Sequence, residues 1–148
     1  AAGWQGARQS GVAFTSPRHV GMQGTAEPSA TAVHDLLANT GMTPRTLLWN
    51  AFPIHPHKLN EPRTNRTPTS AELRVGDDAL CLAMKKRKVL CVGQHAKKSL
   101  ERILGTQIPI PTDATESSLA IVVRHPSHGG TTTFKSESRS ALRVWNLI

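Results

Sequence analysis

The stretch TLLWNAFPIH at residues 46–55 decides how this chain is interpreted, together with RHPS at residues 124–127. The first stretch begins as an apolar segment that stops at the amide of Asn50. The second places the imidazole of His125 just after the apolar residues 120–123. In an open parallel α/β sheet, ligands bind at the carboxyl ends of the strands. We therefore expect Asn50 and His125 to face one crevice, where an amide can read a planar hydrogen-bonding edge and an imidazole can stabilise developing negative charge.

Size and charge narrow the classes of protein that fit. The 148 residues suit one domain, and 18 Lys and Arg against 10 Asp and Glu give a net charge of +8. Such an excess fits a polyanionic partner, most simply nucleic acid, but it also fits a solubilising surface. No stretch has the apolar length of a membrane span, and no signal peptide is visible. Because the chain begins at Ala1 without a methionine, we expect an amino-terminally incomplete copy of a longer protein.

Apolar periodicity predicts alternating helices and strands along the chain. The first helix is expected to be capped by Ser29 and to end just before Gly41. Further helices are expected from the capping box at 69–72 to about Met84, over 94–104, and from 132 onward with Phe134, Leu142 and Trp145 as packing residues. Strands are expected over 46–49, 88–92 and 119–123. This alternation favours an α/β fold with helices on both faces of a parallel sheet. We expect a three-layer α/β/α domain with a mainly parallel sheet of four strands, the first strand missing from this chain.

Four motifs, in this order, resemble those of the uracil-DNA glycosylase superfamily. They are GWQGARQSGVAFTS at 3–16, the Asn50 segment with RTNRTPT at 63–69, the Val92-Gly93 turn with Ala96, and RHPS at 124–127. The resemblance covers nearly the whole chain and implies a single domain over residues 1–148, of the bacterial branch without an iron–sulfur cluster. It also implies base-excision repair, in which a damaged nucleotide is flipped out of DNA and the N-glycosidic bond of uracil, or of another deaminated base, is hydrolysed.

The resemblance assigns the uracil-binding residues. Phe14 matches the ring on which the base stacks, and Asn50 matches the amide that pairs with its Watson–Crick edge. His125 matches the imidazole that hydrogen-bonds the uracil carbonyl where negative charge develops. Gly3 stands where one branch has a tyrosine that excludes thymine, so discrimination against thymine is expected to be relaxed. The alternatives are a core phenylalanine, an asparagine that bonds its own turn and an exposed loop histidine.

A second set of residues is expected to contact DNA. The set implied by the resemblance is Arg66, Ser127, His128, Gly129 and Gly130. His128 could stack in the gap left by the flipped base, where relatives often carry a bulky apolar residue. The basic run at 85–88 either follows phosphates or is simply a solvated surface, and its place before a strand favours the second interpretation.

The first motif departs most from the family, because Ala1 stands where the water-activating Asp or Asn is found. Gln9 is a possible polar substitute, and the alternative is a catalytically impaired relative or fragment that binds DNA or a nucleobase. A third alternative is a basic structural nucleic-acid protein, whose binding would be salt-sensitive and indifferent to uracil. No lysine occupies an expected pocket position, so we expect a monofunctional enzyme without a Schiff-base step.

No cofactor is expected. Cys81 and Cys91 lack the additional cysteine ligands that an iron–sulfur cluster needs. The pair of His55 and His57 lacks a third metal ligand. The expected partner is uracil-containing DNA and not a membrane. We expect a monomer in the bacterial cytoplasm, associated with the nucleoid, with reduced cysteines.

Overall fold

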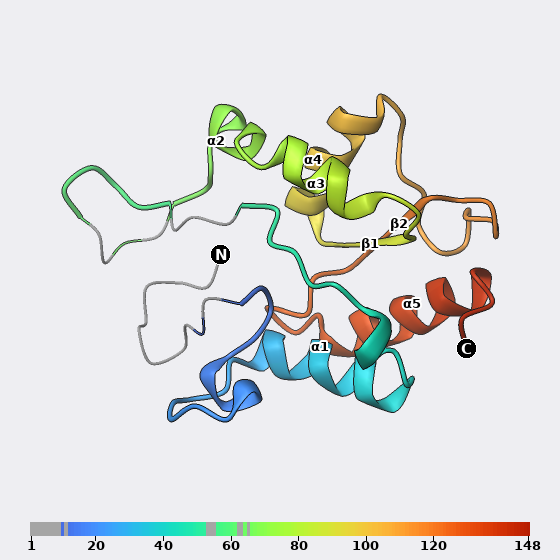
Figure 1. Ribbon diagram of the computed structural model, residues 1–148, viewed down its shortest axis with the longest axis horizontal. Helices are drawn as coiled ribbons and strands as arrows, with labels where there is room; N and C mark the ends of the chain where they lie inside the picture. The colour runs from blue at the N-terminus through green and yellow to red at the C-terminus, as the bar shows by residue number, and fades with distance from the viewer. Residues whose placement is uncertain (1–9, 11, 53–55, 62–63, 65) are drawn as a thin grey trace. The chain divides into compact units, whose positions relative to one another are not determined.

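A computed structural model describes residue 10 and residues 12–52, 56–61, 64 and 66–148. The chain divides into two compact units, Ala1–Gly76 and Asp77–Ile148. The first holds η2 (Pro17–Val20), α1 (Pro28–Asn39), η3 (Thr43–Arg45) and α2 (Ser70–Arg74), and the second holds α3 (Asp77–Met84), β1 (Val89–Val92), α4 (Gln94–Leu104), β2 (Ala120–Val123) and α5 (Thr131–Val144) (Figure 1). Helices and strands thus alternate in the second unit as predicted.

The strands β1 and β2 form a parallel sheet. Their register runs from Val89 opposite Ala120 to Val92 opposite Val123. A parallel pair needs a crossover connection, and α4 supplies it between the two strands. This arrangement confirms the mixed α/β class with a parallel sheet, although within the described ranges the sheet has two strands rather than four.

Helices cover both faces of this sheet, because successive strand residues point to opposite sides. Cys91 and Val122 point to one face, where they form a buried cluster with Leu100 of α4. Ile121 points to the other face and packs against Ala141 of α5 and against Trp145. Figure 1 shows α3 and α4 on one side of the strands and α5 on the other. The second unit is therefore a small three-layer α/β/α arrangement.

The capping box predicted at residues 69–72 is present. The Thr69 hydroxyl accepts a hydrogen bond from the Glu72 N–H, and the Glu72 carboxylate accepts one from the Thr69 N–H. The expected single helix up to Met84 is wrong, however, because α2 ends at Arg74 and α3 begins only at Asp77. Glycine at position 76 is a poor helix former, and an aspartate at 77 favours a new helix start.

The strand predicted at residues 46–49 does not form. Leu47 is 54% exposed and Trp49 is 37% exposed, so the apolar run is only partly covered. A strand needs a neighbour to complete its hydrogen-bond ladder, and this segment has no ladder partner within the described part of the chain. The preceding helix α1 agrees with expectation, since Val33 and Leu36 are buried, but it begins at Pro28 with Glu27 as its N-cap.

Candidate active site

His125 lies two residues beyond the carboxyl end of β2, at the position expected for a ligand-binding group. Its Nδ1 accepts a hydrogen bond from the Ser127 N–H at 3.1 Å and lies 2.8 Å from the Ser127 hydroxyl oxygen. Because Nδ1 acts as an acceptor, the neutral ring carries its proton on Nε2. Burial lowers the pKa of His125, and the positive groups of Arg124, His128 and His95 lower it further. The site thus holds a neutral imidazole that can donate from Nε2.

Contacts from α5 shape the loop that carries His125. The Arg124 N–H donates to the Glu137 carboxylate at 2.6 Å, directly before the imidazole. The Thr131 hydroxyl donates to the Pro126 carbonyl at 3.0 Å, directly after it. The loop is therefore fixed on both sides of His125 by side chains of one helix.

Two glycines allow the backbone to approach His125 closely. A β-carbon at Gly93 would lie 3.0 Å from the Cβ of His125, and one at Gly130 would lie only 2.3 Å from the His125 carbonyl oxygen. Gly130 is buried, so the space that a side chain would need there is taken by the packed interior of the protein. Gly129 has a φ of +75° with open space around it, and it is exposed. Of the two predicted DNA-contacting glycines, Gly129 is thus the one with an accessible surface.

His128 projects from the tip of this loop. It is exposed, and its φ of +51° is rare for a residue with a side chain. Such backbone conformations are concentrated at functional sites and persist where the surrounding structure enforces them. Ser127, by contrast, is half-buried beside the imidazole, with which its hydroxyl and its N–H interact.

The other expected uracil-binding residues belong to the first unit. Phe14 is half-buried and has a φ of +47°, and Asn50 is half-buried in the segment after η3. Gly3 and Gln9 lie outside the described residues, as does His55. Because Phe14 and Asn50 lie in one unit and His125 in the other, their convergence on one base remains a prediction.

Arg66 forms a bidentate ion pair with Glu72, the acidic residue of the capping box. The two nitrogen–oxygen distances are 2.5 and 2.7 Å, and the Arg66 Nε also donates to the His57 carbonyl at 2.8 Å. This ion pair, followed by the Thr69 N–H, holds the pKa of Glu72 at about 2. Arg66 therefore ties the loop at 56–61 to the start of α2, a role that the sequence motif did not suggest.

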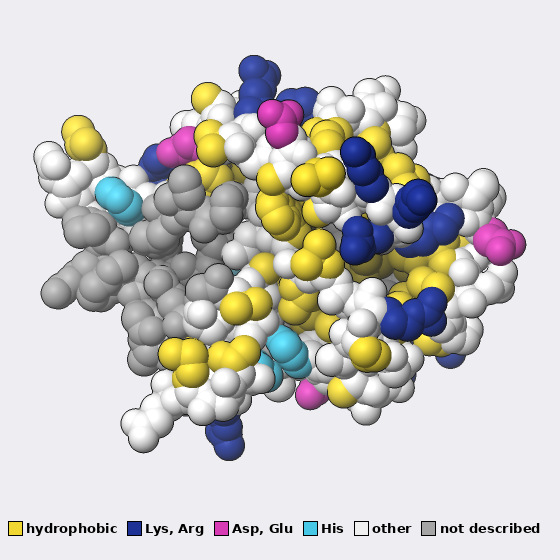
Figure 2. All heavy atoms as spheres, viewed as in Figure 1, with side chains coloured by type: hydrophobic (Ala, Val, Ile, Leu, Met, Phe, Trp, Pro, Cys, Tyr) yellow, Lys and Arg dark blue, Asp and Glu magenta, His cyan; other side chains and the backbone are white. Residues whose placement is uncertain are grey.

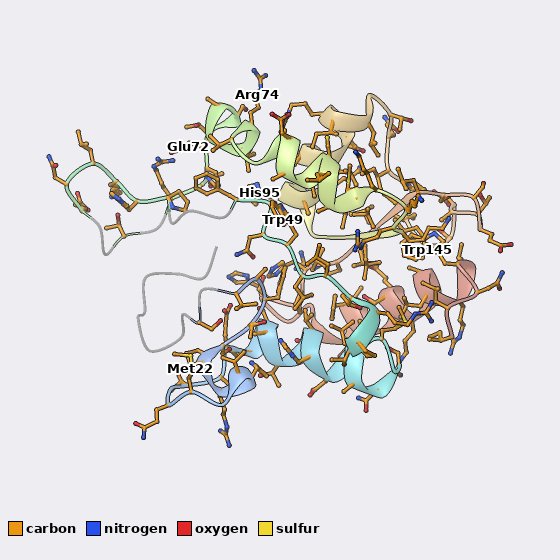
Figure 3. The ribbon with its side chains drawn as sticks, viewed as in Figure 1. Met22, Trp49, Glu72, Arg74, His95 and Trp145 are labelled. Atoms are coloured by element: carbon orange, nitrogen blue, oxygen red, sulfur yellow. The ribbon has the colours of Figure 1, made fainter. Side chains whose placement is uncertain are left out.

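The same pair lies in a shallow depression of about 450 Å³ in the first unit. Its lining consists of Phe52, Pro56, His57, Leu59, Arg66, Glu72 and Val75. Figure 3 labels Glu72, which comes from α2. The depression was not predicted, because its residues come from separate parts of the sequence.

The basic run at residues 85–88 precedes β1 and so lies at the amino edge of the sheet, opposite the edge that carries His125. The Lys88 ammonium donates to the carbonyls of Glu116 and Ser118 and lies 6.0 Å from the ring centre of Trp145, which Figure 3 labels. Figure 2 shows Lys and Arg side chains gathered over the passage from α3 to β1. All four residues of the run are exposed, and Lys88 also joins the start of β1 to the loop before β2 through these contacts.

Among the residues that the structure describes, no group of three or more His, Cys, Asp or Glu could hold a metal ion. In the same residues, no helix combines the length and the apolar character needed to cross a membrane. Burial raises the pKa of the Cys91 thiol to about 12, whereas Cys81 is exposed. Cys91 therefore acts as a small apolar residue of the core.

The family model described as the uracil DNA glycosylase superfamily matches residues 3–148. The chain belongs to that superfamily. Membership in the uracil DNA glycosylase superfamily implies glycosylase chemistry, a hydrolysis, on DNA substrates. No curated protein and no solved structure matched the chain.

Proposed function

We propose that the protein is a monofunctional uracil-DNA glycosylase that flips uracil out of DNA and hydrolyses its N-glycosidic bond. The observation that carries the proposal is the hydrogen bond from the Ser127 N–H to the Nδ1 of His125, which leaves the proton of the neutral ring on Nε2. Burial lowers the pKa of His125 and so favours this neutral ring. Uracil leaves as an anion when the glycosidic bond breaks. A donor aimed at its carbonyl oxygen stabilises that charge without having to transfer a proton.

We assign base recognition to two residues of the first unit, as the resemblance implies. The Phe14 ring supplies a flat apolar face for stacking, and the Asn50 amide supplies one donor and one acceptor for the Watson–Crick edge. Water then adds its hydroxyl to the sugar carbon, and the released proton leaves with the base or solvent. We assign water positioning to Gln9 or to a residue that precedes Ala1. Gly3 offers no side chain that would exclude the methyl group of thymine.

The proposed DNA surface includes the tip of the β2–α5 loop. The exposed His128 and Gly129 can enter the duplex, and Ser127 lies next to them. Basic side chains, Arg66 among them, supply the attraction to phosphates that brings in a polyanion of any sequence. We further propose that the protein acts as a monomer on genomic DNA in the bacterial cytoplasm.

Uracil release and DNA affinity, measured together, test this function. The substrate is a labelled duplex with one uracil, and the matched control duplex carries thymine at that position. Asn50→Ala should lose both rate and selectivity for uracil, whereas Asn39→Ala at the exposed end of α1 should change neither. Uracil release that survives unchanged in Asn50→Ala would overturn the pocket assignment.

The same measurements separate the alternatives. Tight binding to uracil DNA without release would indicate a catalytically impaired relative. Salt-sensitive binding that is equal for both duplexes would indicate a basic structural protein.

A further inference from the structure

Two histidines of the first unit form a stacked pair beside the loop that carries Phe14. His19 belongs to η2 and His34 to α1, and their ring centres lie 4.4 Å apart with the planes inclined by 10°. Nothing in the glycosylase mechanism described above uses either ring. The hydrogen bonds of both rings lead to the residues that follow Phe14.

His34 holds Thr15, the residue directly after Phe14. The Thr15 hydroxyl gives its only proton to the Ala13 carbonyl at 2.9 Å. At 3.0 Å from the His34 Nε2, the same hydroxyl must therefore accept a proton from the ring. Burial lowers the pKa of His34 and electrostatic repulsion by the neighbouring His19 would lower it further, against the opposing effects of a hydrogen bond with the Phe14 backbone and of Asp35. His34 thus acts as a neutral donor that touches both Thr15 and Phe14.

His19 holds Ser16, the next residue. The Ser16 N–H donates to the His19 Nδ1 at 3.2 Å, which leaves the proton of the neutral ring on Nε2. The Thr31 hydroxyl donates to the Glu27 carbonyl at 3.1 Å and can therefore accept from that Nε2, 3.5 Å away. Ser16 is completely buried, and its hydroxyl accepts the Glu27 N–H at 2.7 Å. The loop after Phe14 is in this way joined to the first turn of α1.

Phe14 needs such support because its own backbone is strained. Its φ of +47° lies in the left-handed region, which is disfavoured for a residue with a side chain. A residue keeps such a conformation only where neighbouring contacts enforce it. The two imidazoles supply contacts of this kind at Thr15 and Ser16, next to Phe14 in the chain.

We propose that His19 and His34 are positioning residues that set the orientation of the Phe14 ring for stacking on the extruded base. The inference rests on the proposed function, because only a base-binding role gives the orientation of Phe14 a consequence. Neither histidine touches the base itself. His34 acts through the Thr15 hydroxyl and the Phe14 backbone, and His19 acts through the Ser16 N–H.

Alanine and conservative variants test this role. His34→Ala and His19→Ala should each lower kcat/KM for uracil release about tenfold, a loss that corresponds to 1.4 kcal/mol. His34→Gln keeps a side-chain N–H donor and His19→Asn keeps an oxygen acceptor near the place of Nδ1, so both should recover most of the activity. Asn39→Ala, at the exposed end of the helix that carries His34, is the matched control and should keep the wild-type rate.

A double-mutant cycle shows whether the effect passes through Phe14. On the Phe14→Ala background, His34→Ala should cause little further loss, because the ring that it positions is gone. Full additivity of the two losses would overturn the proposal. So would unchanged kcat/KM in both single alanine variants.

A readout that needs no activity separates this inference from the proposed function. The chain has three phenylalanines, so the ring signals of Phe14 can be assigned by NMR with a Phe14→Leu variant. His34→Ala and His19→Ala should move the Phe14 signals while the Phe134 signals stay in place. If the Phe14 signals do not move in the two variants, the positioning role is refuted even when the enzyme is active. If the signals move but the wild-type protein releases no uracil, only the proposed function is refuted.

Discussion

Gly93 and His125 pack so closely that a β-carbon at position 93 would lie 3.0 Å from the Cβ of the imidazole residue. Gly93 follows β1 and His125 follows β2, so the parallel register brings the two loops together at the carboxyl edge of the sheet. Gly93 also has φ +86° and ψ 175°, a combination that is essentially reserved for glycine. The place of the imidazole therefore depends on the absence of a side chain in the neighbouring loop.

Gly93→Ala should displace His125 and reduce uracil release at least tenfold. The backbone strain should also lower the free energy of unfolding by about 1–3 kcal/mol. Steady-state kinetics and thermal denaturation measure the two effects. Gly105→Ala is the matched control. Gly93 and Gly105 flank the two ends of α4, but Gly105, at φ +66°, has nothing within 4 Å of an added β-carbon. The Gly105→Ala variant should therefore lose some stability and no activity. Equal activity losses in both variants would show that the contact with His125 is irrelevant.

Acidification should inactivate the enzyme through His125. Since burial lowers its folded-state pKa, the imidazole stays neutral until the pH falls below the ordinary value of about 6.5. A proton on Nδ1 would then face the Ser127 N–H, two donors in one contact, and the loop would open. The pH profile of kcat/KM should show an acid limb below pH ~6.5, checked against the ring titration by NMR. His95→Asn removes one of the positive neighbours and should move this limb upward; a limb that moves downward contradicts the assignment.

The same protonation should also weaken the folded state. Below pH ~6.5 the unfolded chain binds a proton at this histidine before the folded one does, so stability falls as the pH falls through that window. Above it, both states are neutral and His125 contributes no pH dependence. Denaturant unfolding at a series of pH values measures the effect, and His125→Gln should reduce it.

Glu137→Ala should slow uracil release several-fold by loosening the loop before His125. Its carboxylate accepts the Arg124 N–H at 2.6 Å, and a hydrogen bond to a charged group contributes about 1.5–3 kcal/mol. Glu137→Gln keeps an acceptor and should lose less. Glu116→Ala changes an exposed acidic residue outside this loop and should behave like the wild type. If Glu137→Ala keeps full activity, α5 does not position the imidazole.

Arg66→Ala should weaken binding to any duplex. If Arg66 contacts a phosphate, the slope of log affinity against log salt should become shallower by about 1. Glu72→Ala provides the comparison, because it breaks the ion pair but keeps the positive charge. Weaker binding with an unchanged slope in both variants would show that Arg66 acts only by holding its loop. Because the pKa of Glu72 is lowered to about 2, the ion pair is intact above pH ~4.5, near the ordinary pKa of a glutamate. It is lost only as the pH falls toward the lowered pKa of about 2.

Local patterns predicted the second unit well. The helix over 94–104 with Gly105 at its end, the two strands and the packing of Phe134 all follow from periodicity and end signals that lie within a few residues. The capping box at 69–72 follows for the same reason. The position of His125 also followed, because an apolar run fixes where a buried strand stops.

Features that depend on distant neighbours were not predictable in this way. The run at 46–49 has the composition of a strand, but a strand forms only beside a partner, and the sequence does not specify one. The Glu137 contact with Arg124 and the stacking of His19 on His34 join different elements, and no local spacing signals them. The break at Gly76 was missed because the residues on both sides have helical patterns.

The exposed charges of the turn before β1 lie at the opposite end of the strands from the imidazole, and the four-residue strand between them alone spans about 13 Å. Salt at 0.1 M screens charges over about 10 Å, so this turn adds little to the electrostatic field at the reacting base. Under the proposed function, any attraction by this turn would act on DNA that is still in solution. The edge of the sheet that carries His125 would act only after the DNA has bound.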